Sequence, residues 1–451
     1  MEIYHPINKP TFEPEKKKGI YIPITTKFWI SHFLSLIWMF ISIYLSFPWL
    51  EDLSSVIPLP AAILIITGIS YIPGYMNAFL VFSLLLDKQP LFKNEHPTDP
   101  ISILIAAYNE EDSIYNTIRY IDKQDYDGKI HVFVINNNST DQTVKEIVRA
   151  KNDFNVHITL LNESKPGKFH ALNKGLEHVT TPFVITLDAD TLLHPSSIRY
   201  IVARLNSSPS NVCAVAGSVL VRNSRQNIWT RLQEWDYFIG IASIKRLQGL
   251  YQGTLVAQGA FSIYKTECIR EVNGWPDAIG EDIVLTWRLL RNKWKVYFEP
   301  LAVAFTDVPT SLRHFAKQRS RWARGMIEGL KEIKPWKQPF VYTKYLTGIN
   351  FIMPYLDVVY TFCWIPGLIL ALFGYFWIVG PYTLFVLPLT LISYSLLYYY
   401  QRNYVFKKLN LKIRKNKKGF IIFILFYQMI MSPISVLGYF QEFFGLKRIW
   451  K

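Results

Sequence analysis

The chain has 451 residues, of which 50% are hydrophobic and 16% are aromatic. This length accommodates one large domain together with membrane segments, and the composition is too apolar for a wholly soluble protein. The formal net charge is +15. Much of this charge lies beside apolar stretches, without a recognisable nucleic-acid-binding module, so we expect a lipid bilayer and not nucleic acid as its partner. The scattered cysteines Cys213, Cys268 and Cys363 indicate neither a zinc site nor a disulfide framework.

Two apolar stretches near the N-terminus, residues 28–47 and 59–86, are each long enough to cross a bilayer. The leader, residues 1–27, contains several lysines, whereas the connection between the stretches holds Glu51 and Asp52 and neither lysine nor arginine. Positive charge favours the cytoplasmic side, so we expect the leader and the central region to face the cytoplasm. The first apolar run begins only near Phe28, which is unlike a signal peptide.

A second apolar region, residues 344–451, is expected to contain about three spans, near 355–376, 382–400 and 420–443. A basic loop at 402–418 should face the cytoplasm. The last span leaves two alternatives. A single crossing would place the basic C-terminal residues outside, whereas a re-entrant break at Pro433 would keep them inside. Asp357, within the first of these spans, is either part of a polar conduit or an interfacial residue.

The central region, residues 87–343, alternates between strand-like and helix-like sequence. The stretches "ISILIAAYNEE", "KIHVFVINNNSTDQT" and "FVITLDADTLLHP" each read as a buried strand that ends in polar residues. We expect βαβ units, whose ligands bind at the carboxyl ends of parallel strands. Asp188 and Asp190 stand at such an end, although a helix N-cap is the alternative for them. Neither a dinucleotide-binding nor a P-loop glycine motif is present.

An ordered series of motifs in this region resembles that of family 2 glycosyltransferases. The series is "AAYNEE", "NNNSTDQT", "GKFHALNKG", "DAD", "GED" at 280–282 and "QRSRW" at 318–322. Among these enzymes it is most similar to membrane-embedded bacterial poly-N-acetylglucosamine synthases, through "EDIVLTWRLLRNKWKVYFEP" and "KQRSRWARG". The resemblance covers about residues 101–329. It implies an α/β, GT-A-like (Rossmann-like) domain that lies in the cytoplasm and is embedded between transmembrane helices of the plasma (inner) membrane.

The resemblance also implies a UDP-sugar donor and a Mg²⁺ or Mn²⁺ ion, because these cations ease the departure of a diphosphate and prefer oxygen ligands. Asp190 would bind the metal, and Asp188 would contact the ribose or a metal-bound water. The other residues implied to bind the nucleotide-sugar are Tyr108, Glu110, Asn137 and Lys168. Asn137 stands where the family often has aspartate, and a solvated turn is the alternative for Lys168.

Asp282 matches the family's catalytic base, and Glu281 stands beside it. A carboxylate can take the proton that the acceptor hydroxyl loses as it attacks the anomeric carbon. The alternative for Asp282 is the N-cap of the following helix. Gly259 falls in the loop that contacts the acceptor in the family.

Gln318, Arg321 and Trp322 are three and four residues apart, so on a helix they share one face. The arginine can bind diphosphate oxygens, and the indole offers a flat surface to the donor sugar or the acceptor. The same stretch, near 313–334, also resembles an amphipathic helix at the membrane interface. Both interpretations are compatible.

The sequence therefore predicts a processive, inverting β-glycosyltransferase that polymerises a sugar and moves the polysaccharide across the membrane. The resemblance favours UDP-N-acetylglucosamine. The alternatives are a hyaluronan- or cellulose-type synthase with another UDP-sugar, a non-processive enzyme that adds one sugar to a lipid acceptor, and a catalytically silent transporter or regulator. A small accessory membrane subunit is a further partner left open.

Overall fold

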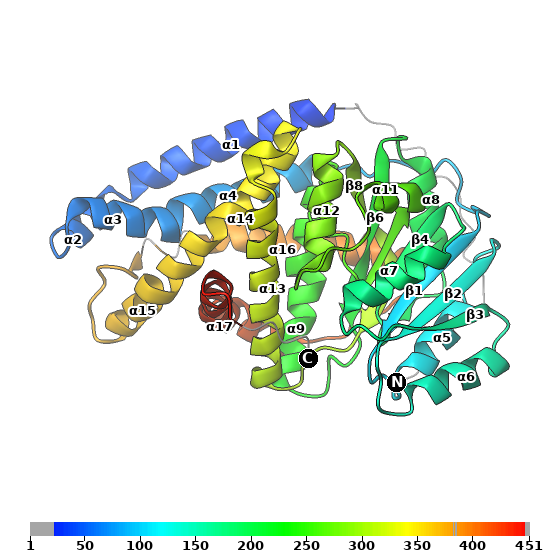
Figure 1. The fold of residues 1–451 in the computed structure, drawn as a ribbon. Coiled ribbons are helices and arrows are strands. Elements are labelled where there is room, and N and C mark those ends of the chain that lie inside the picture. Colours follow the sequence, from blue (N-terminus) through cyan, green and yellow to red (C-terminus); the bar gives the residue numbers. More distant parts are fainter. Residues whose placement is uncertain (1–21, 382, 384–385, 447–451) are drawn as a thin grey trace.

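The computed structural model describes residues 22–381, 383 and 386–446. Most of the expected leader, the start of the expected span at 382–400, and the basic residues after 446 lie outside this part of the chain. Figure 1 shows a sheet-containing domain on one side and long apolar helices on the other.

An eight-stranded mixed sheet forms the centre of the domain, in the order β3-β2-β1-β4-β7-β6-β8-β5. The strands β3, β2, β1 and β4 are parallel, as the βαβ pattern predicts, whereas β7 runs antiparallel to β4 and β6, and β5 runs antiparallel to β8. The bounds are β1 (Ile101–Ala107), β2 (Ile130–Asn136), β3 (His157–Asn162), β4 (Phe183–Leu187), β5 (Leu192–Leu193), β6 (Val212–Val221), β7 (Phe261–Lys265) and β8 (Lys295–Thr306).

Helices cover both faces of this sheet. Ile103 and Ile105 of β1 enter one buried apolar cluster and Leu104 enters another, because successive side chains of a strand point to opposite faces. Strands buried on both faces explain the nearly continuous apolar runs in the sequence. The covering helices are α5 (Ile114–Asp122), α6 (Thr143–Asp153), α7 (Lys168–His178), α8 (Ser197–Ser207), α11 (Thr266–Glu271) and α12 (Glu281–Arg291).

Two further helical segments lie between the sheet and the apolar helices. The first is continuous through α9 (Ile228–Trp235), the π-helical η2 (Asp236–Ile241) and α10 (Ala242–Leu250), and the second is α13 (Leu312–Glu332). Gly280 and Gly325 allow α13 to approach the start of α12 closely, since a Cβ on Gly280 would lie 2.7 Å from the Gly325 Cα. The structure thus brings α13, at Gly325 just after the "QRSRW" motif, against the "GED" motif.

In the part of the chain that the structure describes, four helices are long and apolar enough to cross a membrane. They are α1 (Ile24–Leu45), the continuous α3 (Leu59–Ile66), η1 (Thr67–Tyr71) and α4 (Ile72–Leu85), the continuous α14 (Val341–Val359), η4 (Tyr360–Trp364) and α15 (Ile365–Leu372), and α17 (Lys417–Phe443). The third begins earlier than expected, at Val341. Shorter helices are α2 (Phe47–Ser54), η3 (Pro335–Lys337), α16 (Val386–Tyr400) and η6 (Gln401–Phe406). That any of them crosses a membrane stays a prediction.

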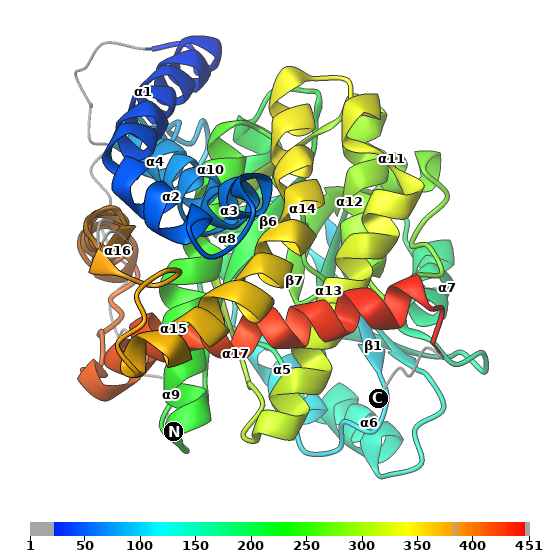
Figure 2. The same cartoon turned by 90° about the vertical axis from the view of Figure 1, so that its left-hand side faces the viewer.

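The last helix, α17, runs across the direction of α1. Figure 1 shows α17 end-on and α1 along its length, whereas Figure 2 shows α17 along its length. Helix α17 continues without interruption through Pro433, so the alternative of a break at this proline is wrong. A proline removes one backbone hydrogen bond from a helix and need not end it when the helix packs against other elements along its length.

Asp357 of α14 faces α17. Its carboxylate accepts hydrogen bonds from the hydroxyls of Ser432 and Tyr439, at 2.8 and 2.7 Å, and a longer one from the Gln428 amide. The side chain is buried between these helices, and both the conduit and the interfacial interpretation stay predictions. These bonds satisfy the carboxylate and join α14 to α17.

Candidate active site

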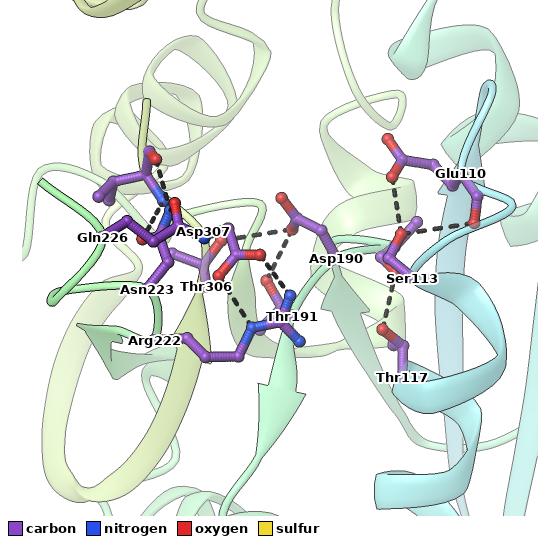
Figure 3. A network of polar contacts seen from close by, with 12 residues as sticks. Glu110, Ser113, Thr117, Asp190, Thr191, Arg222, Asn223, Gln226, Thr306 and Asp307 are labelled. Atoms are coloured by element: carbon purple, nitrogen blue, oxygen red, sulfur yellow. Dashed lines mark hydrogen bonds and ion pairs between the residues drawn. The ribbon is translucent and has the colours of Figure 1, made fainter. Parts of the chain in front are cut away.

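Asp188 and Asp190 follow β4 directly, at the carboxyl end of the parallel strands. Asp190 is mostly buried, and its Oδ1 accepts hydrogen bonds from the hydroxyls of Thr191 and Thr306, at 3.2 and 3.3 Å (Figure 3). Burial, together with the negative charges of Asp188 and Glu110, raises the pKa of Asp190 to about 7. A bound cation would relieve this concentration of negative charge.

The carboxylate oxygens around Asp190 are suitable ligands for Mg²⁺ or Mn²⁺. Among the described residues, no group of three histidine, cysteine, aspartate or glutamate side chains is arranged to hold a metal ion by itself. Asp190, with Asp188 beside it, would therefore supply part of a coordination shell that a diphosphate and water complete.

Lys168 connects Asp188 to the start of α12. Its Nζ donates a hydrogen bond to Asp188 Oδ1 at 2.6 Å and lies 3.4 Å from Glu281 Oε1. Burial opposes the charge of Lys168, but Asp188 and Glu281 outweigh burial and raise its pKa. The interpretation of Lys168 as a solvated turn residue is wrong. Gly259 lies against it, because a Cβ at Gly259 would be 2.5 Å from Nζ.

Asp282 and Glu281 lie in the first turn of α12, after Gly280 as the N-cap residue. The N-cap interpretation of Asp282 is therefore wrong. Asp282 accepts hydrogen bonds from the backbone N–H groups of Gly259, at 3.3 Å, and Ile283, at 2.8 Å. Burial and the negative charge of Asp282 raise the pKa of Glu281 to about 7, although the positive charge of Lys168 opposes this shift. Asp282 is the more accessible of the two acids.

Asn137 has a role that the sequence did not predict. Its Oδ1 accepts a hydrogen bond from Gly167 N–H at 2.8 Å, and its Nδ2 donates to the carbonyls of Glu163 and Lys165, at 3.0 and 2.7 Å. The buried amide thus shapes the turn that leads into Lys168. Contact of Asn137 with a base stays a prediction.

Tyr108 and Glu110 follow β1 on the same edge of the sheet as Asp188 and Asp190, and both are partly exposed. Glu110 accepts a hydrogen bond from the Ser113 hydroxyl at 2.9 Å (Figure 3). The two strand ends are adjacent because β1 pairs with β4.

The motif on α13 presents its side chains to different surroundings. Arg321 and Trp322 are exposed, whereas the Oε1 atom of Gln318 is buried without a hydrogen-bond partner among the described residues. A buried acceptor without a donor is costly and is commonly satisfied by a ligand or water. Gln318 is thus suited to accept a hydrogen bond from a sugar hydroxyl.

Sequence reasoning missed two arginines. Arg319, which is 2% exposed, pairs with Asp236 at 2.7 Å and places its guanidinium 4.0 Å from the centre of the Trp322 ring. Arg222 pairs with Asp307 next to Asp190 (Figure 3). Two features of the sequence could have indicated these arginines. One is Asp236, which lies within the apolar segment of η2, and the other is the polar residues that follow β6 and β8.

The model of the family "Glycosyltransferase like family 2" matches residues 97–325, just over half of the chain. The chain belongs to glycosyltransferase family 2. This confirms the predicted family and enzyme class, and the matched residues run from the segment before β1 into α13.

Two curated relatives carry the name poly-beta-1,6-N-acetyl-D-glucosamine synthase. The Staphylococcus epidermidis protein (strain RP62A) is 30% identical over 268 residues, 59% of this family 2 chain and 64% of the relative. The Staphylococcus aureus protein (strain MSSA476) is 32% identical over 246 residues, 54% of this chain and 58% of the relative. The matches thus span about three fifths of each relative.

A solved structure shares the fold. The mannosyltransferase PcManGT from Pyrobaculum calidifontis, in complex with GDP-Man and Mn²⁺, has a TM-score of 0.59 and 18% sequence identity. The alignment covers 85% of this chain and 98% of that one. The predicted GT-A-like fold is confirmed, with the addition that the sheet is mixed.

Proposed function

We propose that this chain is an inverting β-glycosyltransferase of the plasma membrane that polymerises a sugar from a UDP-sugar, with UDP-N-acetylglucosamine as the donor. The observation that carries this proposal is the position of Lys168, which connects Asp188, at the end of β4, to Glu281, beside the base Asp282. One site thereby holds acids for a donor complex and a separate carboxylate for the acceptor. The names of the two Staphylococcus relatives support the choice of sugar.

The donor half of the site consists of Asp188, Asp190, Lys168 and the residues after β1. Mg²⁺ or Mn²⁺ held by Asp190 and Asp188 would neutralise the diphosphate of the leaving UDP. Lys168 adds a positive charge on the same side. Tyr108 and Glu110, at the adjacent strand end, would contact the base and the ribose. Asn137 would contribute indirectly, because it shapes the turn that leads into Lys168.

The acceptor half centres on Asp282. An acceptor oxygen forms a bond to the anomeric carbon while the bond from that carbon to UDP breaks, and Asp282 takes the acceptor's proton. A single displacement at an α-linked donor gives a β product. Two backbone N–H groups donate to Asp282 and hold its carboxylate in position. Glu281 keeps Lys168 in place.

Gln318, Trp322 and Gly259 would form the surface for the donor sugar and the acceptor. The unpaired Oε1 of Gln318 would accept from a sugar hydroxyl, and the exposed ring of Trp322 would stack on a sugar. Arg321, exposed on the same helix, would bind diphosphate oxygens. At Gly259, the absent side chain leaves room for Lys168 and for the acceptor.

The apolar helices support the membrane part of this proposal. Their number and the lysines of the leader support a cytoplasmic catalytic domain, from where the growing polysaccharide would pass across the bilayer. Processive addition predicts a long product. Extension of a primer by the purified chain only after an accessory membrane subunit is added would show that the chain needs this subunit.

The test uses the full chain in lipid nanodiscs with Mg²⁺ or Mn²⁺ and labelled UDP-N-acetylglucosamine, with products resolved by size. We expect a ladder or high-molecular-weight product, and its absence with Asp282→Asn, which should still bind UDP. Asp190→Ala should weaken metal-dependent donor binding. One sugar added to lipid would contradict processivity, and transfer only from another nucleotide-sugar would contradict the proposed donor. Near-normal turnover by Asp282→Asn would contradict the assignment of the base.

A further inference from the structure

Lys245 of α10 is a buried lysine that the mechanism above does not use. Its side chain is 8% exposed, and its Nζ donates a hydrogen bond to the Val256 carbonyl at 2.9 Å. Lysine is seldom buried to this extent without an opposite charge, because desolvation of an ammonium group is costly. The surroundings of Lys245 therefore call for an explanation.

Val256 belongs to the loop 255–259, which ends against the catalytic base. Hydrogen bonds hold this loop along its length. They run from Leu255 N–H to Gln248 Oε1 at 3.1 Å, from Lys245 to Val256, from Ala257 N–H to Thr286 Oγ1 at 2.9 Å, from the Tyr264 hydroxyl to the Ala257 carbonyl at 2.7 Å, and from Gly259 N–H to Asp282 at 3.3 Å. A network of this kind is rigid.

Lys245 and Asp282 also interact through charge. Burial lowers the pKa of Lys245 to about 7, and the negative charge of Asp282 opposes this effect. By reciprocity, a charged Lys245 stabilises the Asp282 carboxylate. The other ionisable groups that act on Asp282 are Lys168 of α7, Glu281 of α12 and Tyr264 of β7.

We propose that Lys245 is a positioning residue for glycosyl transfer, which holds the loop 255–259 against Asp282 and supplies positive charge behind the base. This inference rests on the proposed function of Asp282. Lys245 lies behind the loop and acts through it, so Lys245 is expected to affect the transfer step and not the binding of UDP.

The test compares Lys245→Met, Lys245→Arg and Thr286→Val with the unchanged chain. Methionine has similar bulk and carries neither charge nor a hydrogen-bond donor. In Lys245→Met we expect kcat to fall roughly tenfold with an unchanged KM for the donor. If the positive charge of Lys245 supports the base, its loss should move the acid limb of the kcat profile to higher pH by roughly one unit.

The two other variants separate charge from loop geometry. Lys245→Arg keeps the charge and should keep the acid limb in place, even if kcat falls. Thr286→Val removes the hydrogen bond from Ala257 N–H and the one that the Thr286 hydroxyl donates to the Asp282 carbonyl at 2.6 Å, without changing a charge, so it should lower kcat and leave the acid limb unmoved. Binding of UDP reports that each variant is folded. If Lys245→Met does not fold, displacement of the acid limb in Lys245→Arg would overturn the electrostatic part of the proposal.

Failure of this inference can be distinguished from failure of the proposed function. Transfer by the unchanged chain is measured first, with a panel of UDP- and GDP-sugars, and the variants are compared with whichever donor is used. An active chain whose kcat and acid limb are the same in Lys245→Met would overturn the inference alone. Activity only with a donor other than a UDP-sugar would overturn the proposed donor alone. An unchanged chain that is inactive with every donor would overturn both.

Discussion

Lys168 is the residue on which the geometry of the candidate active site depends most directly. It lies between Asp188, at the end of β4, and Glu281, at the start of α12. Two carboxylates beside one ammonium group leave a net negative charge, which suits a site for a metal-bound diphosphate. The acids would repel one another without the lysine.

Replacing Lys168 by methionine should lower kcat roughly a hundredfold and raise the KM for the donor, because a preorganised positive charge is lost beside the diphosphate. The measurement is initial transfer rate against donor concentration. Lys174→Met is the matched control on the same helix, since Lys174 pairs with Glu177 near the surface. Equal losses in both variants would contradict a special role for Lys168.

At the scale of elements, α13 connects the catalytic domain to the apolar helices. One of its buried residues, Arg319, pairs with Asp236 in η2 and supports the ring of Trp322. Its glycine at 325 touches the backbone of Gly280. The proposed acceptor surface on α13 is thus held in position by contacts with η2 and with α12.

Asp236→Asn should lower the free energy of unfolding by about 3 kcal/mol, because it leaves the Arg319 guanidinium buried without its counter-charge. Chemical unfolding in detergent measures this change. The control is Glu146→Gln, which breaks the more exposed pair with Arg149 and should cost less than about 1 kcal/mol. A similarly small cost for Asp236→Asn would show that the buried pair contributes little.

At the scale of the whole molecule, both ends of α17 are attached to the catalytic domain. At the first end, Asn416 donates to the Arg231 carbonyl of α9 and accepts from the Trp235 indole. At the last, Glu442 pairs with Arg324 and Lys331 of α13. A helix held at both ends by one domain lies along that domain, although its length and composition would allow it to cross a bilayer.

We therefore expect the C-terminal end of α17 to lie on the same side of the membrane as the catalytic domain. The measurement is labelling of single cysteines by a membrane-impermeant maleimide in sealed vesicles, after Cys363 has been replaced by alanine. Leu446→Cys should react from the same side as Lys145→Cys on α6, and Glu51→Cys in α2 should react from the other side. Reaction of Leu446→Cys together with Glu51→Cys would show that α17 crosses.

Much of the fold was predictable because its signals are local. The apolar run before Asp188 is short and β-branched, which indicates a buried strand, and the acids after it mark the ligand-binding edge. The lengths of the apolar stretches likewise predicted α1 and the helix through α3 and α4. The ordered motifs predicted the family and the GT-A-like domain.

The remaining features depend on contacts between distant parts of the chain. The sequence by itself determined the strands, the apolar helices and the acids at the strand end, since periodicity and residue type express them locally. Only the tertiary structure decided that Lys168 joins Asp188 to Glu281, that Arg319 pairs with Asp236, and that α17 lies along the catalytic domain. Pairing of this kind depends on the order of strands and the packing of helices, which no local pattern encodes.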